Sequence, residues 1–293
     1  MSTAAVVVMG CAVCAGSPGP QTYEKGQIEE QSRTAHAVGA SVEARAGSIT
    51  VGRGASRLDI SERRLEPRLS YAYDDTIGVS VGVPVLVRAI RSESMDRVDV
   101  EPGDLDAWVT GSLLRQGTSL RQTASVGGVI KAPTANVALD ELGDPLPASA
   151  QPGCSSLVPG ASVAYALWWD RWSLSVSGAL TVPFAVREAP HRGVLVTHAS
   201  TLEVRPVREV GIAAGWLWIV ESVGQDENGS GEPDSGGFVA RVTAGVTVGR
   251  PELLEVSAGI EVPVVSVLGG DQAVGPIGMV RAGGTWELPR QVL

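Results

Sequence analysis

Hydrophobic and polar residues alternate along most of the chain from about residue 65 to its end. The stretch 77–87 shows the pattern most clearly, because every odd-numbered position in it is isoleucine or valine while the even-numbered positions include Gly78 and Ser80. The same two-residue period recurs in 172–184 and 238–248. A period of two is typical of β-strands whose two faces meet different surroundings.

The length of these runs separates two kinds of β protein. Strands of soluble proteins average about five or six residues, whereas tilted membrane strands need about nine to eleven, and the runs here last about ten or more. We therefore expect an all-β fold, a single antiparallel up-and-down transmembrane β-barrel of about 12 strands, with its apolar face toward lipid and its polar face toward a lumen. The expected strands lie near 39–52, 57–73, 76–90, 103–115, 122–132, 156–169, 172–186, 193–205, 209–222, 237–249, 253–264 and 276–288.

The connections between the expected strands alternate in length. Tight turns are expected at 74–75, 170–171 and 250–251, and longer connections at 133–154 and 225–236. Short turns at one rim and long loops at the other are typical of outer-membrane barrels.

Tryptophan residues gather near the ends of the expected strands, at Trp168, Trp169, Trp172, Trp216 and Trp218. These positions suit the aromatic girdle of a membrane barrel. For each single residue, ordinary core filling is an equally good interpretation.

Composition narrows the class of protein further. The 293 residues include 36 Gly and 18 Pro but only 2 Phe, so turn residues are plentiful and large core aromatics are few. No amphipathic helix is evident, which argues against a soluble α/β enzyme. The net charge of −9 argues against nucleic acid as a partner, because binding to phosphates needs a basic stripe.

The N-terminal part predicts export. Its apolar run 4–16 is shorter than the roughly 20 residues of a spanning helix but matches the hydrophobic part of a signal peptide. Residues 8–11 resemble a lipobox, which makes Cys11 a candidate for lipidation; cleavage near Ala15 and an uncleaved apolar tail are the alternatives. We expect an export signal or lipoprotein-type segment at 1–20, a flexible segment at 21–38 and the β-barrel at 39–293.

Candidate metal and cofactor sites are few. Cys11 and Cys14 form a CxxC, but no histidine follows it and no second CxxC is present, while Cys154 stands alone in a loop. The segment 226–231 resembles the start of a calcium loop, yet its twelfth position is Gly237 where an EF-hand needs glutamate. We expect neither a metal nor a cofactor.

Candidate catalytic residues are similarly weak. The segment 78–82 matches the GxSxG of a nucleophile elbow, but it lies inside the clearest strand pattern, where the required strand-to-helix turn has no place. The three histidines are His36, His191 and His198; His191 falls in a turn and His198 on the apolar face of its strand. We expect that the protein is not an enzyme.

Charged residues also occur on the polar face of the expected strands. In a closed soluble core they would be costly, whereas a wet lumen accepts them. They could form ion pairs across the barrel or line a solute path, and the two roles are compatible. The candidate lumen-lining residues are Glu66, Arg68, Asp104, Asp106, Lys131, Glu203, Arg205, Arg241, Glu255 and Glu261.

Short segments 64–71, 103–105, 128–134 and 151–155, in this order, resemble the outer-membrane transporters grouped with the meta-pathway of phenol degradation. The likeness covers roughly residues 60 to 288. It implies a porin-like barrel of about 12 strands that passes small or hydrophobic molecules. Two departures are Cys154, where a small uncharged loop residue is expected, and a chain end without a strand-closing aromatic residue.

Together these patterns predict a bacterial outer-membrane channel or transporter for small, and in part hydrophobic, solutes. Its expected partners are the lipid bilayer, a small-molecule solute and the outer-membrane assembly machinery. Two alternatives remain open at this point: a non-transporting structural or surface barrel, and a lipid-anchored periplasmic β-sandwich.

Overall fold

The computed structural model describes residues 36–288 apart from 74–75, 117–119, 187, 227, 233–234 and 251–252. The segment expected to direct export, with Cys11 and Cys14, lies outside the described residues, as does the chain end after residue 288. No helix in the described part of the chain is long and apolar enough to cross a membrane.

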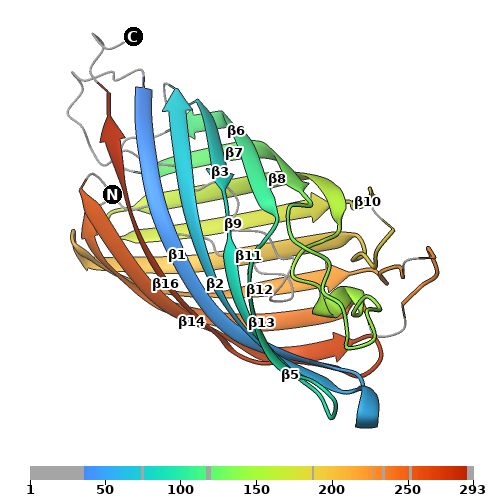
Figure 1. Ribbon diagram of the computed structural model, residues 1–293. Coiled ribbons are helices and arrows are strands. Elements are labelled where there is room, and N and C mark those ends of the chain that lie inside the picture. The colour runs from blue at the N-terminus through green and yellow to red at the C-terminus, as the bar shows by residue number, and fades with distance from the viewer. Residues whose placement is uncertain are drawn as a thin grey trace.

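The described chain is built almost entirely from antiparallel strands (Figure 1). The elements in chain order are β1 (His36–Val51), η1 (Gly54–Ser56), β2 (Leu58–Tyr73), β3 (Ile77–Gly82), β4 (Val85–Arg91), β5 (Asp96–Pro102), β6 (Leu105–Gln116), β7 (Leu120–Ala132), η2 (Ala148–Ala150), β8 (Ser156–Trp169), β9 (Trp172–Thr181), β10 (Phe184–Ala185), β11 (Leu195–Val207), β12 (Val210–Glu221), β13 (Gly237–Arg250), β14 (Leu254–Leu268), β15 (Gln272–Val274) and β16 (Ile277–Glu287).

The sheet closes on itself because β1 pairs with β2 on one side and with β16 on the other. β3 and β4 both pair with β2 and form one barrel strand in two parts, and β5 with β6 forms the next. With β10 and β15 as short additions, the wall has twelve strands. This confirms the predicted all-β barrel and excludes the β-sandwich.

The two interrupted strands meet at a proline and a glycine. Pro84, between β3 and β4, has no backbone N–H to donate, but its carbonyl accepts the N–H of Gly103 at 2.8 Å. A Cβ atom on Gly103 would lie 2.8 Å from Pro84 Cγ, so glycine permits this approach. The alternation predicted a strand beginning near 103; the structure extends it back to Asp96, because Val98 and Val100 continue the outward apolar face.

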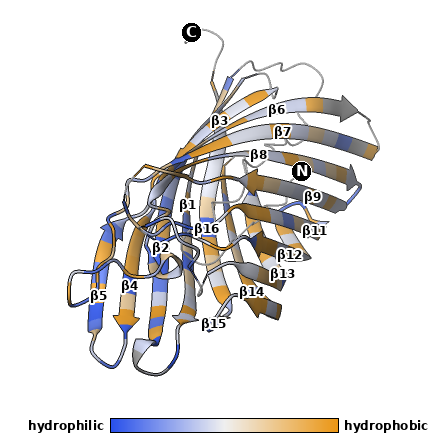
Figure 2. Cartoon of the chain, turned by 90° about the vertical axis from the view of Figure 1, so that its right-hand side faces the viewer, coloured by the Kyte–Doolittle hydropathy of each residue, from blue (hydrophilic) through white to orange (hydrophobic). Residues whose placement is uncertain are grey.

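Exposure follows the predicted alternation. Val79, Val81 and Val83 are each more than 40 % exposed, whereas Ser80 between them is 5 % exposed. Valine, leucine and isoleucine therefore form the outer surface, and small or charged residues face the interior. Figure 2 shows this banding as alternating orange and pale or blue segments along the strands.

The two rims of the barrel differ in their connections. β1 begins and β16 ends at one rim (Figure 1), and there Asp170 and Arg171 join β8 to β9. We call this the short-turn rim; the expected turns at 74–75 and 250–251 fall at least partly outside the described residues. The opposite, long-loop rim carries the connections after β7, β9 and β12.

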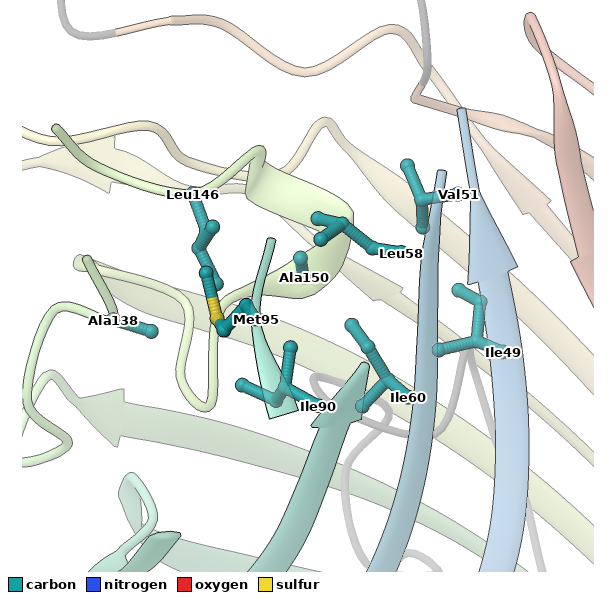
Figure 3. Packing of buried hydrophobic residues seen from close by; sticks show 9 residues of the cluster. All are labelled: Ile49, Val51, Leu58, Ile60, Ile90, Met95, Ala138, Leu146 and Ala150. Atoms are coloured by element: carbon teal, nitrogen blue, oxygen red, sulfur yellow. The ribbon is translucent and has the colours of Figure 1, made fainter. Parts of the chain in front are cut away.

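One side of the wall extends further than the rest at the long-loop rim. β7 ends opposite Leu105, the first residue of β6. The barrel strand that contains β6 extends beyond this level as β5, which pairs with β4 as far as Asp96. The segment 133–155, here called the cap loop, packs against the inner face of this extension (Figure 3). The buried cluster consists of Ile49, Val51, Leu58, Ile60, Ile90, Met95, Ala138, Leu146 and Ala150.

The lipid-facing side of β13 supports a first prediction. Val242 is 49 % exposed on the outer face, and Thr243, the next residue, faces the interior opposite Glu261. We expect Val242→Arg to destabilise the barrel in lipid vesicles by about 2–4 kcal/mol, because a buried cation in hydrocarbon is unfavourable. Urea unfolding followed by tryptophan fluorescence measures the effect. Thr243→Arg is the control, and equal effects of the two variants would contradict the assignment of faces.

Candidate functional site

The interior of the barrel is the candidate functional site. All ten charged residues singled out in the sequence lie on the inner side of the wall, opposite the exposed apolar residues. Seven are buried, namely Glu66, Asp104, Asp106, Lys131, Glu203, Arg241 and Glu261; Arg68, Arg205 and Glu255 are half-buried.

The most extensive charged network joins β2 to β6. Arg68 donates from Nη2 to Glu66 Oε1 at 2.6 Å and to Asp106 Oδ1 at 2.6 Å, and from Nη1 to Ser80 Oγ at 3.0 Å. Arg64 donates to the other oxygen of Glu66, with Nη2 at 2.6 Å. Charge-assisted hydrogen bonds of this length are among the strong ones in proteins. The network is therefore closed within the wall and leaves little net charge.

A glycine gives this network its space. A Cβ atom on Gly82 would lie 2.7 Å from Arg68 Nη2 and 2.8 Å from both Asp106 Oδ1 and Glu66 Oε1. The charged side chains therefore lie directly over Gly82 of β3. Alternation alone would have placed Arg64 on the inner face, two residues from Glu66, but it gave no indication that Gly82 matters.

A second charged group lies where the barrel closes, on β1, β13 and β14. Arg45 Nε donates to Glu43 Oε1, and Arg241 Nη1 donates to the carbonyl of Gly275 at 3.2 Å. Glu261 is fully buried, and among the described residues neither of its carboxylate oxygens has a hydrogen-bond partner. It interacts electrostatically with both Arg45 and Arg241. Glu43 and Arg45 were not among the candidates from sequence.

A third group lies near the short-turn rim. Arg205 Nε donates to Glu203 Oε1 at 2.6 Å, and Arg205 Nη2 donates to Glu255 Oε2 at 3.0 Å. A Cβ atom on Gly211 would overlap Glu203 Oε1. As at Gly82, a glycine on a neighbouring strand makes room for an ion pair.

A further set of ion pairs lies near the cap loop. Arg88 is fully buried, with Nε 3.5 Å from Glu62 Oε2 and Nη1 3.4 Å from Glu101 Oε1, and it donates to the carbonyl of Ala150 in the cap loop. Arg192, in the connection between β9 and β11, pairs with Glu221 and interacts electrostatically with Glu62.

The cap loop is anchored to the wall by Asp104. Its two carboxylate oxygens accept the backbone N–H of Ala135 at 3.1 Å and of Cys154 at 2.5 Å, so both ends of the loop are held. Gln151 is fully buried inside the loop and exchanges hydrogen bonds with the backbone of Ala138. Glu232 from the connection between β12 and β13 accepts the N–H of Ala148. The cap loop is thus a packed structure at the long-loop rim.

Asp104→Asn is expected to loosen the cap loop, since the amide can accept only one of the two N–H groups. A loss of about 1.5–3 kcal/mol of local stability is expected for a charge-assisted hydrogen bond. Limited proteolysis of the folded protein, with cleavage sites mapped by mass spectrometry, measures the loosening within 133–155. Asp140→Asn at the loop tip, where Asp140 accepts the N–H of Leu142, is the matched control. Equal cleavage of both variants would contradict the anchoring role.

The part of the wall formed by β8 and β9 is uncharged. β8 and β9 contain no charged residue at all, and both strands are fully described. Their inward positions are mostly Ser and Ala, with the buried Trp168 near the short-turn rim. This side of the interior is therefore polar without charge and lined by small groups.

Some charged pairs lie at the rims, outside the spanning strands. Glu209, in the turn between β11 and β12, accepts a hydrogen bond from Arg250 Nε at 2.9 Å, and this interaction lowers the pKa of the Glu209 carboxyl from its ordinary value. Both side chains are exposed, so the pair contributes little to stability.

The histidines occupy three unrelated places. His198 lies on the outer face, stacked on Trp218 with ring centroids 5.2 Å apart and hydrogen-bonded to Ser200 Oγ at 3.0 Å. His191 lies in a loop, with Nδ1 3.1 Å from the carbonyl of Arg192. His36 begins β1 beside Tyr71. The structure does not bring these residues together.

The two short motifs also have structural explanations. The GxSxG segment 78–82 lies within β3, where Ser80 and Gly82 face the ion-pair network. In the acidic segment at 226–231, Asp226 Oδ1 accepts the backbone N–H groups of Asn228 and Ser230. In the described part of the chain, no three acidic, histidine or cysteine side chains are grouped so that they could hold a metal ion.

Comparison with known proteins bears on the fold. No protein-family model and no curated protein matches the sequence. Among solved structures, the COG4313 outer membrane channel from Pseudomonas putida F1 has a TM-score of 0.67 at 10% identity, over 89% of this chain and 100% of that one. A deltaS2 mutant of the TodX monoaromatic hydrocarbon channel has a TM-score of 0.48 at 9% identity, over 88% of this chain and 91% of that one.

The closed wall and its apolar outer surface decide the class of protein. The chain is an outer-membrane β-barrel. Within the hydrocarbon of a membrane, a sheet can pair all its backbone N–H and C=O groups in hydrogen bonds only by closing into a barrel. The exposed valine, leucine and isoleucine side chains of β3, β13 and β14 supply the contact with lipid. In bacterial outer-membrane barrels the short turns face the periplasm and the long loops face the exterior. The cap loop of this outer-membrane barrel is therefore on its outer side.

Proposed function

We propose that this outer-membrane barrel is a porin-like channel that carries small solutes, hydrophobic ones among them, across the outer membrane. The observation that supports this most strongly is the uncharged stretch of inner wall formed by β8 and β9, beside strands whose charges are paired. Charges on β1, β2 and β6 are largely neutralised in ion pairs, while β8 and β9 present small uncharged residues. A neutral solute moving along β8 and β9 would meet no charged side chain that could bind it strongly.

In this proposal the ten inward charged residues shape the lumen and do not bind the solute. Their mixed sign implies little preference between anions and cations. The cap loop would narrow the outer mouth, since it is packed there against the wall extension. The resemblance to transporters grouped with the meta-pathway of phenol degradation supports a hydrophobic cargo.

The proposal includes the route by which the barrel reaches the membrane. An export segment at 1–20, followed by recognition by the assembly machinery, fits a barrel of this kind, and Cys11 is its candidate lipidation site. These residues lie outside the described part of the chain. Neither a catalytic role nor a cofactor is part of the proposal.

A pair of neighbouring residues on β8 tests the proposal. Ala164 faces the interior and Val163, 61 % exposed, faces lipid. We expect liposomes containing the wild-type protein to swell in isotonic solutions of small uncharged solutes. Ala164→Trp should abolish most of the swelling by filling the lumen, whereas Val163→Trp should leave it unchanged.

A non-transporting structural barrel is the alternative, and one observation favours it. A second buried cluster, formed by Ala199, Leu217, Ile219 and Ile277, fills part of the interior toward the long-loop rim. If wild-type liposomes do not swell although the protein is folded, the structural role is the better account. If both tryptophan variants swell as the wild type does, the solute path does not pass Ala164.

A further inference from the structure

Three hydroxyl groups inside the barrel stand out because they are buried without a partner. Among the described residues, the hydroxyls of Ser175 and Ser177 on β9 and of Thr197 on β11 have no hydrogen-bond partner. Ser175 is 7 % exposed and Thr197 is 4 % exposed. Buried polar groups in proteins are almost always hydrogen-bonded, so each unpartnered one needs an explanation.

Strand register places these groups on one strip of the inner wall. Ser175 and Ser177 are two residues apart on β9, so their side chains point to the same side about 7 Å apart. Thr197 pairs with Ala179, the next inward position after Ser177. The three hydroxyls therefore form a continuous line that rises from the short-turn half of the barrel toward the long-loop rim.

Small residues flank the line on both sides. Across β8 and β9, Ser175 pairs with Ala166 and Ser177 pairs with Ala164. On the other side Ser177 pairs with Ala199 of β11. Methyl groups beside hydroxyls give a surface that is apolar over most of its area and offers hydrogen bonds at regular intervals.

An indole group marks the short-turn end of the same strip. Trp168 is the next inward residue after Ala166 on β8, and it is 5 % exposed. Its Nε1–H also has no hydrogen-bond partner among the described residues. Four unpartnered hydrogen-bonding groups thus follow one another on a wall that has no charged residue on β8 or β9.

We propose that Trp168, Ser175, Ser177 and Thr197 form a hydrogen-bonding track that selects small uncharged solutes bearing hydroxyl or carbonyl groups. The inference rests on the proposed channel function and names the class of its solute. Each group exchanges hydrogen bonds with the passing molecule, and the alanines contact its carbon atoms. Ions, which need full charge compensation, gain nothing from such a surface.

The test uses the full-length protein in liposomes and the four-carbon polyol erythritol as the probe. The track variant is Ser175→Ala/Ser177→Ala/Thr197→Val, which removes the hydroxyls and leaves the other atoms nearly unchanged. The control is Thr243→Val/Thr247→Val/Ser257→Ala, which removes the same number of inward hydroxyls from β13 and β14. Heat-modifiable migration on gels verifies that each variant is folded.

We expect the track variant to slow erythritol influx by roughly five- to tenfold, the loss expected for one or two hydrogen bonds, and the control to change it little. Potassium chloride conductance should stay close to the wild-type value in both. Equal erythritol rates in wild type and track variant, or equal slowing in both triple variants, would overturn the track.

The outcomes also separate this inference from the proposed function. If the wild-type protein passes neither erythritol nor ions, the channel itself is wrong and the track falls with it. If it passes ions or other solutes and the track variant behaves like the control, the channel stands and only the track is wrong.

Discussion

Asp106→Asn is expected to destabilise the folded barrel by about 3–5 kcal/mol, because removing one partner of a buried ion pair leaves the other charge uncompensated. Asp106 is 1 % exposed and accepts from Arg68 Nη2 at 2.6 and 2.8 Å. Lys131 lies opposite it in the register of β6 and β7. Without the carboxylate, Arg68 keeps only Glu66, which it shares with Arg64, and Lys131 faces the uncharged amide.

Urea unfolding in detergent micelles, monitored by tryptophan fluorescence, measures this effect. The double variant Arg68→Met/Asp106→Leu is the matched control, because replacing both members of a buried pair with apolar residues is often close to neutral. It should recover most of the lost stability. An Asp106→Asn protein as stable as the wild type would show that water in the lumen screens the network.

Shortening the cap loop should produce the largest functional effect. Replacing residues 137–150 with a short glycine linker removes Ala138, Leu146 and Ala150 from the buried cluster at the long-loop rim. It also removes the carbonyl that Arg88 contacts. Since this segment narrows the outer mouth in the proposed channel, we expect single-channel conductance to increase several-fold.

A shortened loop elsewhere on the same rim provides the control. Replacing 226–231, where Asp226 accepts the N–H groups of Asn228 and Ser230, with the same linker should leave conductance near the wild-type value. Unchanged conductance after removal of the cap loop would show that the solute path does not pass beneath it. A similar increase in both variants would point to general loosening of the rim.

The main features of the barrel could be predicted from alternation alone. Runs such as 77–87 and 172–184 are long enough, and separated clearly enough into two faces, to indicate membrane strands and their outward side. The missed part of the wall was β5, where Arg97, Asp99 and Glu101 alternate with valines. The expected strands stopped near 90 and resumed near 103, although the period of two is intact in this segment.

The internal arrangement was less accessible to sequence reasoning. Alternation gives the face of a residue but not its partner, and Arg68 meets Asp106 across 38 positions of the chain. Gly82 matters only because that pair lies over it. Trp168 fitted a lipid-facing girdle as well as the core; in the structure it is buried on the inner face.

The cap loop illustrates a second limit. The sequence indicated a long connection at 133–154 and nothing about its inward packing. That packing depends on contacts with Met95 and Ile90, which come from a hairpin of a different part of the wall. Such long-range contacts have no local pattern, so only the structure reveals that the loop packs against the inner face of the wall.

The most direct test of the channel account is the conductance of the purified full-length barrel in planar lipid bilayers. Folded protein, verified by heat-modifiable migration on gels, should insert and give uniform stepwise increases in current, with similar permeability to potassium and chloride. Folded protein that inserts into the bilayer but passes neither current nor, in liposomes, any small solute would contradict the account and leave a structural barrel.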